Sequence, residues 1–321
     1  MADAPRLDDL RQAAERIGPY IHRTPVLTCR AINAMVGAEI FFKCENFQKA
    51  GAFKFRGATN AVFSLTEQEA CRGVGTHSSG NHAAALALAA STRRVKAYVV
   101  MPQNASQVKK DAVAAYGAEI TFCTPTLEAR QQALAKVVEE TGAAVVHPYN
   151  DYRVIAGQAT AALELMEDVA DLDVVMTPIG GGGLASGTAL YVKYTRPQTK
   201  VIAAEPMGAD DAFRSLRSGK LIPSENPKTI ADGLLTSLGD KTFPIVAEYL
   251  DDIVTVSEEG IIEAMRCIWE RMKIVVEPSA VVPLGALLTG RPELAGRRIG
   301  IILSGGNVDL GRLPWLSGQE G

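Results

Sequence analysis

A lysine between two phenylalanines is the first residue of this sequence that could do chemistry. Lys54 lies in the stretch GAFKFRGATN, with Phe53 before it and Phe55 after it. A lysine is ordinarily a solvated surface amine. In an apolar pocket, however, desolvation lowers the pKa of the amine and makes it available as a nucleophile or a base. Other motifs in the sequence are needed to distinguish a solvated surface amine from a reactive amine in an apolar pocket.

Four consecutive glycines form a second candidate for chemistry. They lie in TPIGGGGLASG, residues 177–187, where a predicted strand ends and a predicted helix begins. The glycines are Gly180, Gly181, Gly182 and Gly183. Backbone N–H groups without neighbouring Cβ atoms leave room for an anion, and the helix dipole adds attraction. We therefore predict a phosphate-binding loop, with a tight turn without a ligand as the alternative.

The same loop also fits a dinucleotide-binding pattern. Gly180, Gly182 and Ala185 satisfy G-x-G-x-x-A. The next predicted strand ends in Glu205, an acid suited to a ribose hydroxyl. The loop alone therefore does not distinguish a nicotinamide cofactor from another phosphate ligand.

Two polar turns favour a different cofactor. SSGNH, residues 78–82, offers hydroxyl, amide and backbone donors to a carboxylate. SGGN, residues 304–307, follows the last predicted strand and directs Ser304 to the carboxyl edge of a sheet, where ligands of α/β proteins bind. A dehydrogenase needs neither turn, nor Lys54. Pyridoxal phosphate uses all four features, because it has a phosphate, a ring nitrogen and an aldehyde and it binds amino acids.

The elements that position these residues alternate between strands and helices from about residue 73 onward. Short segments rich in Val and Ile predict strands at 73–78, 95–101, 118–123, 143–148, 173–179, 200–205, 252–257 and 296–304. Helical periodicity predicts helices at 81–91, 105–117, 126–142, 154–170, 184–195 and 258–272. This alternation predicts an α/β fold with parallel sheets and helices on both faces.

Composition excludes several classes of function. The 321 residues carry a net charge of −3 without a basic cluster, so nucleic acid is not an expected partner. The longest apolar run, at 83–90, is too short to span a bilayer, and no signal peptide is evident. Five cysteines without a C-x-x-C pair indicate reduced thiols in a cytoplasm. The four scattered histidines argue against a His-ligated metal centre.

Several collinear motifs resemble the fold-type II pyridoxal phosphate enzymes, specifically the family of serine racemase, serine/threonine dehydratase and 3-hydroxyaspartate dehydratase. The motifs are HRTPVL (22–27), KCENFQKAGAFKFRGATNAV (43–62), THSSGNHA (76–83), HPYNDYRVIAGQATAALE (147–164), PIGGGGLASG (178–187), EPSA (277–280) and LSGGNVDL (303–310). The resemblance favours pyridoxal phosphate strongly over a nicotinamide cofactor.

The resemblance implies a fold like that of the tryptophan synthase β-subunit, with two parallel-sheet α/β domains and the cofactor in the cleft between them. Residues 1–72 and 151–321 would form the large cofactor-binding domain, and residues 73–150 a small mobile domain. A homodimer is expected because the family forms dimers.

The resemblance also implies roles for single residues. Lys54 would be the Schiff-base lysine, Phe53 would pack against the cofactor ring, and Asn81 would contact the ring 3-hydroxyl. Ser304 would face the pyridine nitrogen. The phosphate would bind to Gly180, Gly181, Gly182 and Gly183. The substrate would contact Ser78, Ser79, Gly80, Asn81, His82 and Arg130.

Ser79 separates two activities. In the racemases a serine at this place faces the cofactor opposite the lysine, so that Lys54 and Ser79 would move the α-proton on opposite faces. Dehydration needs only one base and a route for the β-hydroxyl. The alternative for Ser79 is a helix N-cap or a carboxylate ligand without acid–base work.

A divalent cation is the second implied ligand. Glu205, Ala209 and Asp211 resemble the cation site of the family, and two carboxylates with a backbone carbonyl suit Mg²⁺, Ca²⁺ or Mn²⁺. The alternative is that these acidic residues are simply solvated.

Arg130 bears on the choice of substrate. It corresponds to an arginine that the racemase and hydroxyaspartate members place near the active site, where it would bind a second carboxylate. The alternative is a solvated helix arginine. Tyr149, after HP, is expected to line the substrate pocket.

We therefore predict a pyridoxal-phosphate-dependent dehydratase, or ammonia-lyase, that acts on a small-molecule amino acid. It would convert 3-hydroxyaspartate, serine or threonine to a 2-oxo acid and ammonia by α-proton abstraction and β-elimination. A racemase that uses Lys54 and Ser79 is the alternative, and an NAD-dependent oxidoreductase is a distant third.

Overall fold

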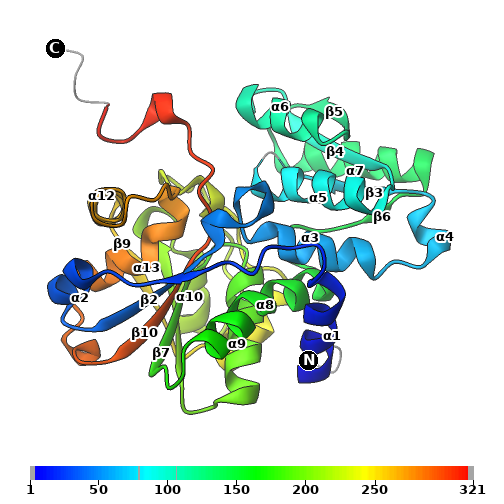
Figure 1. Ribbon diagram of the computed structural model, residues 1–321. Coiled ribbons are helices and arrows are strands. Elements are labelled where there is room, and N and C mark those ends of the chain that lie inside the picture. Colours follow the sequence, from blue (N-terminus) through cyan, green and yellow to red (C-terminus); the bar gives the residue numbers. More distant parts are fainter. Residues whose placement is uncertain (1–3, 79, 106, 317–321) are drawn as a thin grey trace.

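The computed structural model describes residues 4–78, 80–105 and 107–316 and contains two separate β-sheets with helices packed on them (Figure 1). The strands are β1 (Val26–Leu27), β2 (Glu39–Cys44), β3 (Val74–His77), β4 (Ala97–Pro102), β5 (Glu119–Cys123), β6 (Ala144–Val145), β7 (Val174–Pro178), β8 (Lys200–Pro206), β9 (Asp252–Val256) and β10 (Arg298–Leu303). The helices are α1 (Leu7–Ile17), α2 (Arg30–Val36), α3 (Lys54–Phe63), α4 (Glu67–Ala70), α5 (Asn81–Arg93), α6 (Gln107–Ala115), α7 (Leu127–Thr141), α8 (Tyr152–Asp168), α9 (Gly183–Thr195), α10 (Asp211–Ser218), α11 (Thr242–Tyr249), α12 (Glu258–Met272) and α13 (Pro278–Leu288).

The larger sheet has six strands in the order β1-β2-β10-β7-β8-β9. Its strands pair in parallel, except that β1 runs antiparallel to β2. Alternation of side chains along β7 gives each face its own core, because Val174 and Met176 pack toward α12 and α13, whereas Val175 packs toward α8 and α9. Helices therefore cover both faces, which confirms the predicted α/β fold.

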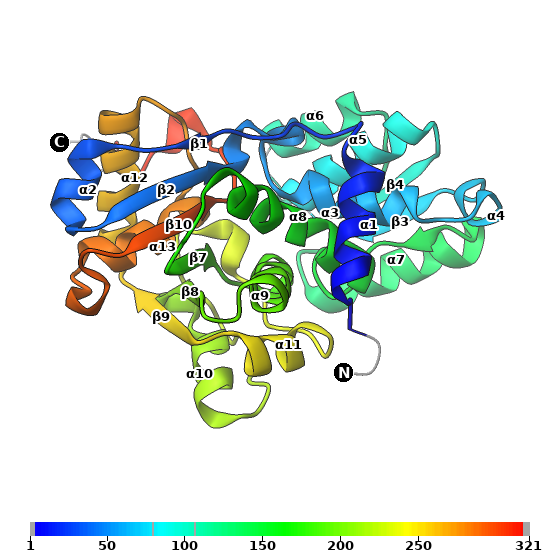
Figure 2. The ribbon, with the colours of Figure 1, turned by 60° about the horizontal axis from the view of Figure 1, so that its bottom comes forward.

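The smaller sheet has four parallel strands in the order β5-β4-β3-β6. Along β4, Val99 and Met101 pack against α5 and α6, whereas Val100 packs against α7 on the other face. Figures 1 and 2 show this sheet and its helices as a lobe beside the larger sheet. The division into domains at residues 73 and 150 stays a prediction. The core of this lobe also includes side chains of α3, which packs against α5.

Local sequence signals explain where several helices begin and end. The hydroxyl of Thr126 accepts a hydrogen bond from the backbone N–H of Ala129 at the start of α7, and Gly142 ends the same helix with φ +69°. Ser257 caps α12 in the same way.

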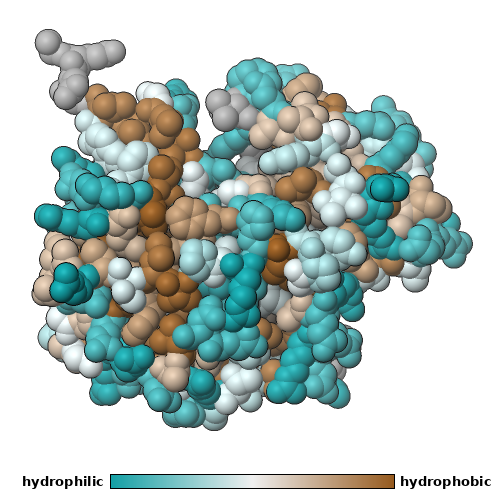
Figure 3. All heavy atoms as spheres, in the orientation of Figure 1, coloured by the Kyte–Doolittle hydropathy of each residue, from teal (hydrophilic) through white to brown (hydrophobic). Residues whose placement is uncertain are grey.

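The surface in the view of Figure 3 is mostly polar, with a band of apolar side chains on the half that carries the larger sheet. No helix among the described residues is long and apolar enough to cross a membrane.

Candidate active site

A cavity of about 470 Å³ opens at the C-terminal ends of strands from both sheets. Its wall includes His77 at the end of β3, Pro178 at the end of β7 and Ser304 directly after β10. It gathers most of the predicted cofactor and substrate residues: Phe53, Lys54, Ser78, Gly80, Asn81, His82, Arg130, Gly180, Gly181, Gly182, Gly183 and Ser304. Ser79 lies outside the described residues. Glu205, Ala209 and Asp211 do not line this cavity.

Lys54 is the first residue of α3 and lines the cavity, where its side chain is partly buried. Its Nζ atom donates a hydrogen bond of 2.8 Å to the backbone oxygen of Pro148 and lies 5.1 Å from the ring centre of Phe53. Burial lowers the pKa of the Lys54 amine to about 8, against the opposing effect of the negative charge of Glu277. The interpretation as a fully solvated amine is therefore wrong.

The start of α3 is held in place from two sides. The backbone N–H of Phe53 donates a hydrogen bond of 2.9 Å to the backbone oxygen of Ser304, which lies after β10. Two residues beyond Lys54, the fully buried guanidinium of Arg56 pairs with Glu45 and with Glu164, each at 2.7 Å. Lys43 completes this buried group through its contact of 2.6 Å with Glu164. These contacts fix Lys54 relative to the larger sheet.

The glycine loop is buried at the start of α9, and Gly182 has a φ of +85°, which favours glycine. A Cβ atom on Gly181 would lie 2.4 Å from ring carbons of Tyr149, so no side chain fits there. The hydroxyl of Thr242 fixes the loop by donating a hydrogen bond of 2.9 Å to the oxygen of Gly181. The loop therefore lies at the positive end of a helix, and its binding of a phosphate stays a prediction.

The turn after β3 forms another part of the cavity wall. Gly80 occupies the N-cap position of α5, so the first N–H groups of that helix lie at this turn. His82 is 2% exposed, and burial lowers its pKa to about 3, so its ring is neutral at physiological pH. One ring nitrogen of His82 lies 3.1 Å from the backbone oxygen of Val146. The turn therefore offers hydrogen bonds to an anion rather than a positive side chain.

Arg130 reaches the cavity from α7. Its Nε atom donates a hydrogen bond of 3.3 Å to the backbone oxygen of Thr126. No ion pair joins Arg130 to a carboxylate of the described residues, although its charge helps to lower the pKa of His77, which burial lowers most. Arg130 is thus a partly buried cation at the cavity rather than a wholly solvated one.

Sequence reasoning missed the two carboxylates of the cavity, Glu277 and Asp232. Glu277 is 4% exposed and accepts hydrogen bonds from the Nδ2 atom of Asn81 at 2.9 and 3.1 Å. Burial raises the pKa of Glu277 to about 7. Lys109 and Asp232 also line the cavity and form an ion pair of 2.5 Å. The motif EPSA contains Glu277 and could have drawn attention to it.

The predicted cation residues lie at the end of β8 and the start of α10. Glu205 is fully buried and accepts hydrogen bonds from the backbone N–H groups of Ala212 and Phe213 at 2.9 and 2.8 Å. Both carboxylate oxygens of Asp211 are buried without a hydrogen-bond partner in the described structure. Burial raises the pKa of Glu205 to about 8 and that of Asp211 to about 6. No cluster of three His, Cys, Asp or Glu side chains suited to a metal occurs among the described residues.

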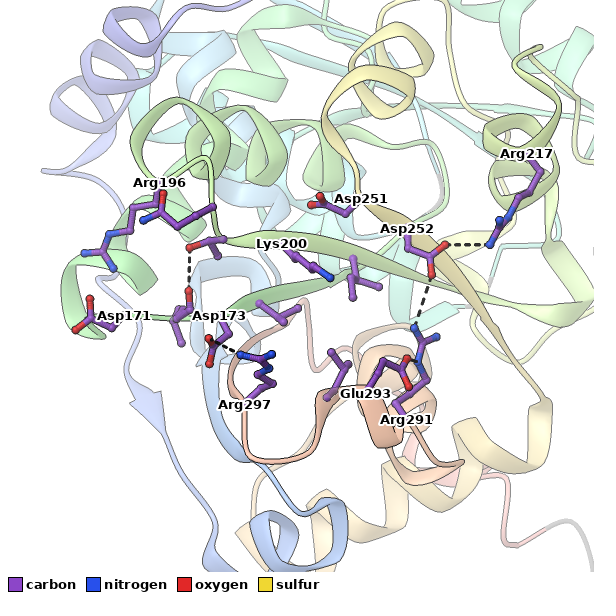
Figure 4. Close-up of a pocket in the computed structure, with 16 residues that line it drawn as sticks. Asp171, Asp173, Arg196, Lys200, Arg217, Asp251, Asp252, Arg291, Glu293 and Arg297 are labelled. Carbon is purple, nitrogen blue, oxygen red and sulfur yellow. Dashed lines mark hydrogen bonds and ion pairs between the residues drawn. The ribbon is translucent and has the colours of Figure 1, made fainter.

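A larger cavity of about 660 Å³ lies at the opposite, N-terminal ends of the strands of the larger sheet (Figure 4). Its charged side chains largely neutralise one another, as in the pairs of Arg217 with Asp252 at 3.2 Å and of Arg297 with Asp173 at 3.4 Å. None of the predicted site residues lines it. We therefore take the cavity around Lys54 as the candidate active site.

Comparison with known proteins shows to which family the chain belongs. Residues 17–305 match the model of a protein family described as pyridoxal-phosphate dependent enzyme. The chain is 53% identical over 311 residues to the beta-hydroxyaspartate dehydratase of Paracoccus denitrificans, covering 97% of this chain and 99% of that protein. It is 52% identical over 309 residues to the serine racemase of Dictyostelium discoideum, covering 95% of each. The solved structure of maize serine racemase, at 47% identity, superimposes with a TM-score of 0.95 and covers 98% of this chain and 97% of that one.

Proposed function

The chain belongs to the pyridoxal-phosphate dependent enzyme family, and from this premise we propose that it is a dehydratase of 3-hydroxy amino acids. The net reaction releases ammonia and a 2-oxo acid, because the water lost at the β-carbon is taken up again when the C–N bond is hydrolysed. Membership of the family confirms the resemblance seen in the sequence and removes the support for a nicotinamide cofactor.

The residues of the cavity fit pyridoxal phosphate. Gly180 to Gly183 line the cavity at the start of α9, where backbone N–H groups and the positive end of the helix suit a phosphate. The partly buried amine of Lys54 suits the aldehyde, and the buried hydroxyl of Ser304 suits the ring nitrogen. When bound, the cofactor stabilises the negative charge that develops at the α-carbon of an amino acid.

Lys54 would then act as the base. A pKa near 8 leaves a usable fraction of the amine unprotonated near neutral pH, so Nζ can accept the α-proton of the substrate. The turn at residues 78–82 would hold the α-carboxylate of the substrate through N–H groups at the start of α5. Ser79, within this turn, lies outside the described residues. This arrangement orients the Cα–H bond toward one face of the cavity.

The unpaired guanidinium of Arg130 is the observation that favours 3-hydroxyaspartate over serine and threonine. 3-Hydroxyaspartate has a second carboxylate, and an arginine without an ion-pair partner can bind it through two parallel hydrogen bonds. Serine and threonine offer no group of this charge. The similarity to the beta-hydroxyaspartate dehydratase of Paracoccus denitrificans supports the same substrate.

The first experiment measures 2-oxo acid release from the stereoisomers of 3-hydroxyaspartate beside L-serine and L-threonine, with added Mg²⁺ and at matched concentrations. A large preference for hydroxyaspartate is expected. Comparable or greater turnover of serine or threonine would overturn the substrate assignment and leave the dehydratase assignment standing. The Lys54→Ala variant, expected to release no 2-oxo acid, controls for background chemistry.

A serine racemase activity is the second candidate, because the chain is also about half identical to serine racemases. Racemisation needs a second proton-transfer group opposite Lys54, and we propose Ser79 for this role. The Ser79→Ala variant is expected to lose racemisation while it retains elimination of the substrate that Lys54 deprotonates. Loss of both activities would show that Lys54 and Ser79 do not transfer the α-proton separately on opposite faces of the substrate.

We further propose a divalent cation at Glu205, Ala209 and Asp211, which the unpartnered buried oxygens of Asp211 support.

A cytoplasmic homodimer is also proposed. All five cysteines are free, as expected in a reducing compartment.

A further inference from the structure

Three segments that are distant in the sequence meet at the carboxylate of Glu277. Asn81 begins α5, Glu277 immediately precedes α13, and Asn307 follows β10. The Nδ2 atom of Asn81 donates to both oxygens of Glu277, at 2.9 and 3.1 Å, and the backbone N–H of Asn307 donates to Oε2 at 3.2 Å. The carboxylate therefore connects the lobe of the smaller sheet to the larger sheet.

The same contacts fix which end of the Asn81 amide faces Glu277. The Nδ2 atom of Asn307 donates to the backbone oxygen of Ala50 at 2.8 Å. Because this acceptor is a backbone carbonyl, it fixes the orientation of the Asn307 side-chain amide. That nitrogen also donates to Oδ1 of Asn81 at 3.0 Å. Since Oδ1 of Asn81 faces a donor, its Nδ2 must face the acceptor Glu277. The amide of Asn81 thus has one orientation in this network.

Close packing leaves Glu277 little freedom to move. A Cβ atom on Gly305 would lie 2.7 Å from its Oε1 atom, so the chain after β10 passes directly against the carboxylate. The backbone N–H of Glu277 donates to the oxygen of Gly305 at 3.0 Å. Both the backbone and the side chain of Glu277 are therefore anchored to the loop that carries Ser304.

The charged groups around Glu277 come from both lobes. Lys54 and Lys109 supply positive charge, and Asp232 supplies negative charge. All three line the same cavity. The three hydrogen bonds that Glu277 accepts favour its ionised form, whereas burial opposes that form and raises its pKa to about 7.

We propose that Glu277 is a positioning residue, whose carboxylate holds the Asn81 amide, and with it the start of α5, in register with the Ser304 loop. This inference rests on the proposed function, because it assigns the fixed turn to the binding of cofactor and substrate. Glu277 acts through Asn81 and needs no contact with the reacting atoms. Its removal should loosen the substrate turn while Lys54 and the glycine loop stay in place.

Glu277→Gln is the most conservative variant, because it keeps the size of the side chain and replaces one acceptor oxygen by a donor that opposes Nδ2 of Asn81. A double-mutant cycle with Asn81→Ala tests whether the two residues act as a unit. The quantity to measure is the dissociation constant of pyridoxal phosphate, by titration of the cofactor-free protein. Hydrogen exchange of the first turn of α5 in the cofactor-free protein is the second readout.

Each single variant is expected to weaken cofactor binding about tenfold, and the double variant also about tenfold rather than hundredfold, since coupled residues are not additive. Exchange at the start of α5 should be faster in Glu277→Gln than in the unmodified protein. A double variant that binds the cofactor about a hundredfold more weakly would show that the two residues act independently, and this would overturn the proposal. So would a Glu277→Gln protein with unchanged cofactor binding and unchanged exchange.

Controls separate positioning from general loss of structure. Glu258→Gln is the matched variant, because Glu258 also lies at a helix start and accepts a backbone N–H, that of Ile230 at 2.8 Å, but outside the cavity. It should change neither readout. If Glu277→Gln fails to fold, Asn307→Ala removes the second contact of Asn81 and is expected to accelerate the same exchange, and unchanged exchange would overturn the proposal. Neither readout uses turnover, so a wrong substrate assignment would not affect the result.

Discussion

The Nζ atom of Lys54 donates its hydrogen bond to the backbone oxygen of Pro148, at 2.8 Å, and not to a carboxylate. A neutral acceptor leaves the positive charge of the amine without the full compensation that an ion pair gives. Burial then lowers the pKa of Lys54 to about 8, although the charge of Glu277 opposes this effect. The contact therefore both orients the amine and keeps it close to deprotonation near neutral pH.

The pH dependence of this amine is the first prediction. In the cofactor-free protein, acylation of Lys54 should rise with a midpoint near pH 8, because only the unprotonated amine reacts. The unfolded chain binds more protons than the folded chain between pH 8 and about 10.4, so the contribution of Lys54 to the free energy of unfolding should increase with pH there. Peptide mass spectrometry after brief labelling measures the midpoint, with the exposed Lys200 as the reference site. A midpoint near 10 for Lys54 would contradict the prediction.

Arg130→Ala should discriminate between substrates. We expect kcat/KM for 3-hydroxyaspartate to fall about 30-fold or more, equivalent to about 2 kcal/mol, because the second carboxylate loses its partner. Turnover of L-serine should change little. Arg130→Lys should restore only part of the loss, since an ammonium cannot form two parallel hydrogen bonds. Lys136→Ala, on the exposed side of α7, is the control. An equal loss of kcat/KM for 3-hydroxyaspartate and L-serine would show that Arg130 has a structural role and does not bind the second carboxylate.

A divalent cation should stabilise the protein through Asp211. At a Mg²⁺ concentration of about 100 times its dissociation constant, linkage adds about 2.7 kcal/mol to the free energy of unfolding. A thermal melt of the cofactor-free protein should therefore shift upward by several degrees on addition of Mg²⁺. Asp211→Asn should abolish the shift, whereas Asp8→Asn on the exposed face of α1 should preserve it. A shift that survives in Asp211→Asn would place the cation elsewhere.

The buried ion group around Arg56 should dominate stability near the active site. Arg56→Met is expected to lower the free energy of unfolding by about 3–5 kcal/mol, because Glu45 stays buried without its ion-pair partner and Glu164 keeps only Lys43. Urea unfolding measures the loss. Arg11→Met removes an exposed pair with Asp8 at 3.6 Å and should cost less than about 1 kcal/mol. Similar losses for the two variants would show that burial does not decide the strength of these pairs.

Much of the candidate site was predictable because local sequence determines where strands end. In parallel sheets the C-terminal ends of strands lie at one edge, so the glycine-rich and polar turns after the neighbouring strands β7 and β10 approach one another. The turn after β3 belongs to the smaller sheet, so its place at the same cavity depends on how the two sheets pack together. Gly180, Ser304 and the turn after His77 carry such signals and line the same cavity. Most strands and helices from residue 73 onward were predictable from local hydrophobic periodicity, although the strand expected at 143–148 is only Ala144–Val145 and helices α10, α11 and α13 were not predicted.

The residues that escaped prediction are those whose role depends on distant partners. Glu277 contacts Asn81, which is 196 residues away, and although the motif EPSA contains it, the local sequence does not show which residue its carboxylate meets. Helix α13 was also missed, because it is buried on all sides and contains Pro283, so it has neither an amphipathic pattern nor good helix propensity. Tyr149 was expected in the pocket, but its packing against Gly181 follows from tertiary structure alone.

The order of strands has a consequence for the biosynthesis of the protein. Strand β10 lies between β2 and β7, yet it is the last of the described strands to leave the ribosome. Until it emerges, β2 has no parallel neighbour, and the loop that carries Ser304 does not exist. The four strands of the smaller sheet, by contrast, are translated as one uninterrupted segment. The nascent chain can therefore complete the smaller sheet before β10 is translated, while the larger sheet and the cofactor cavity need β10.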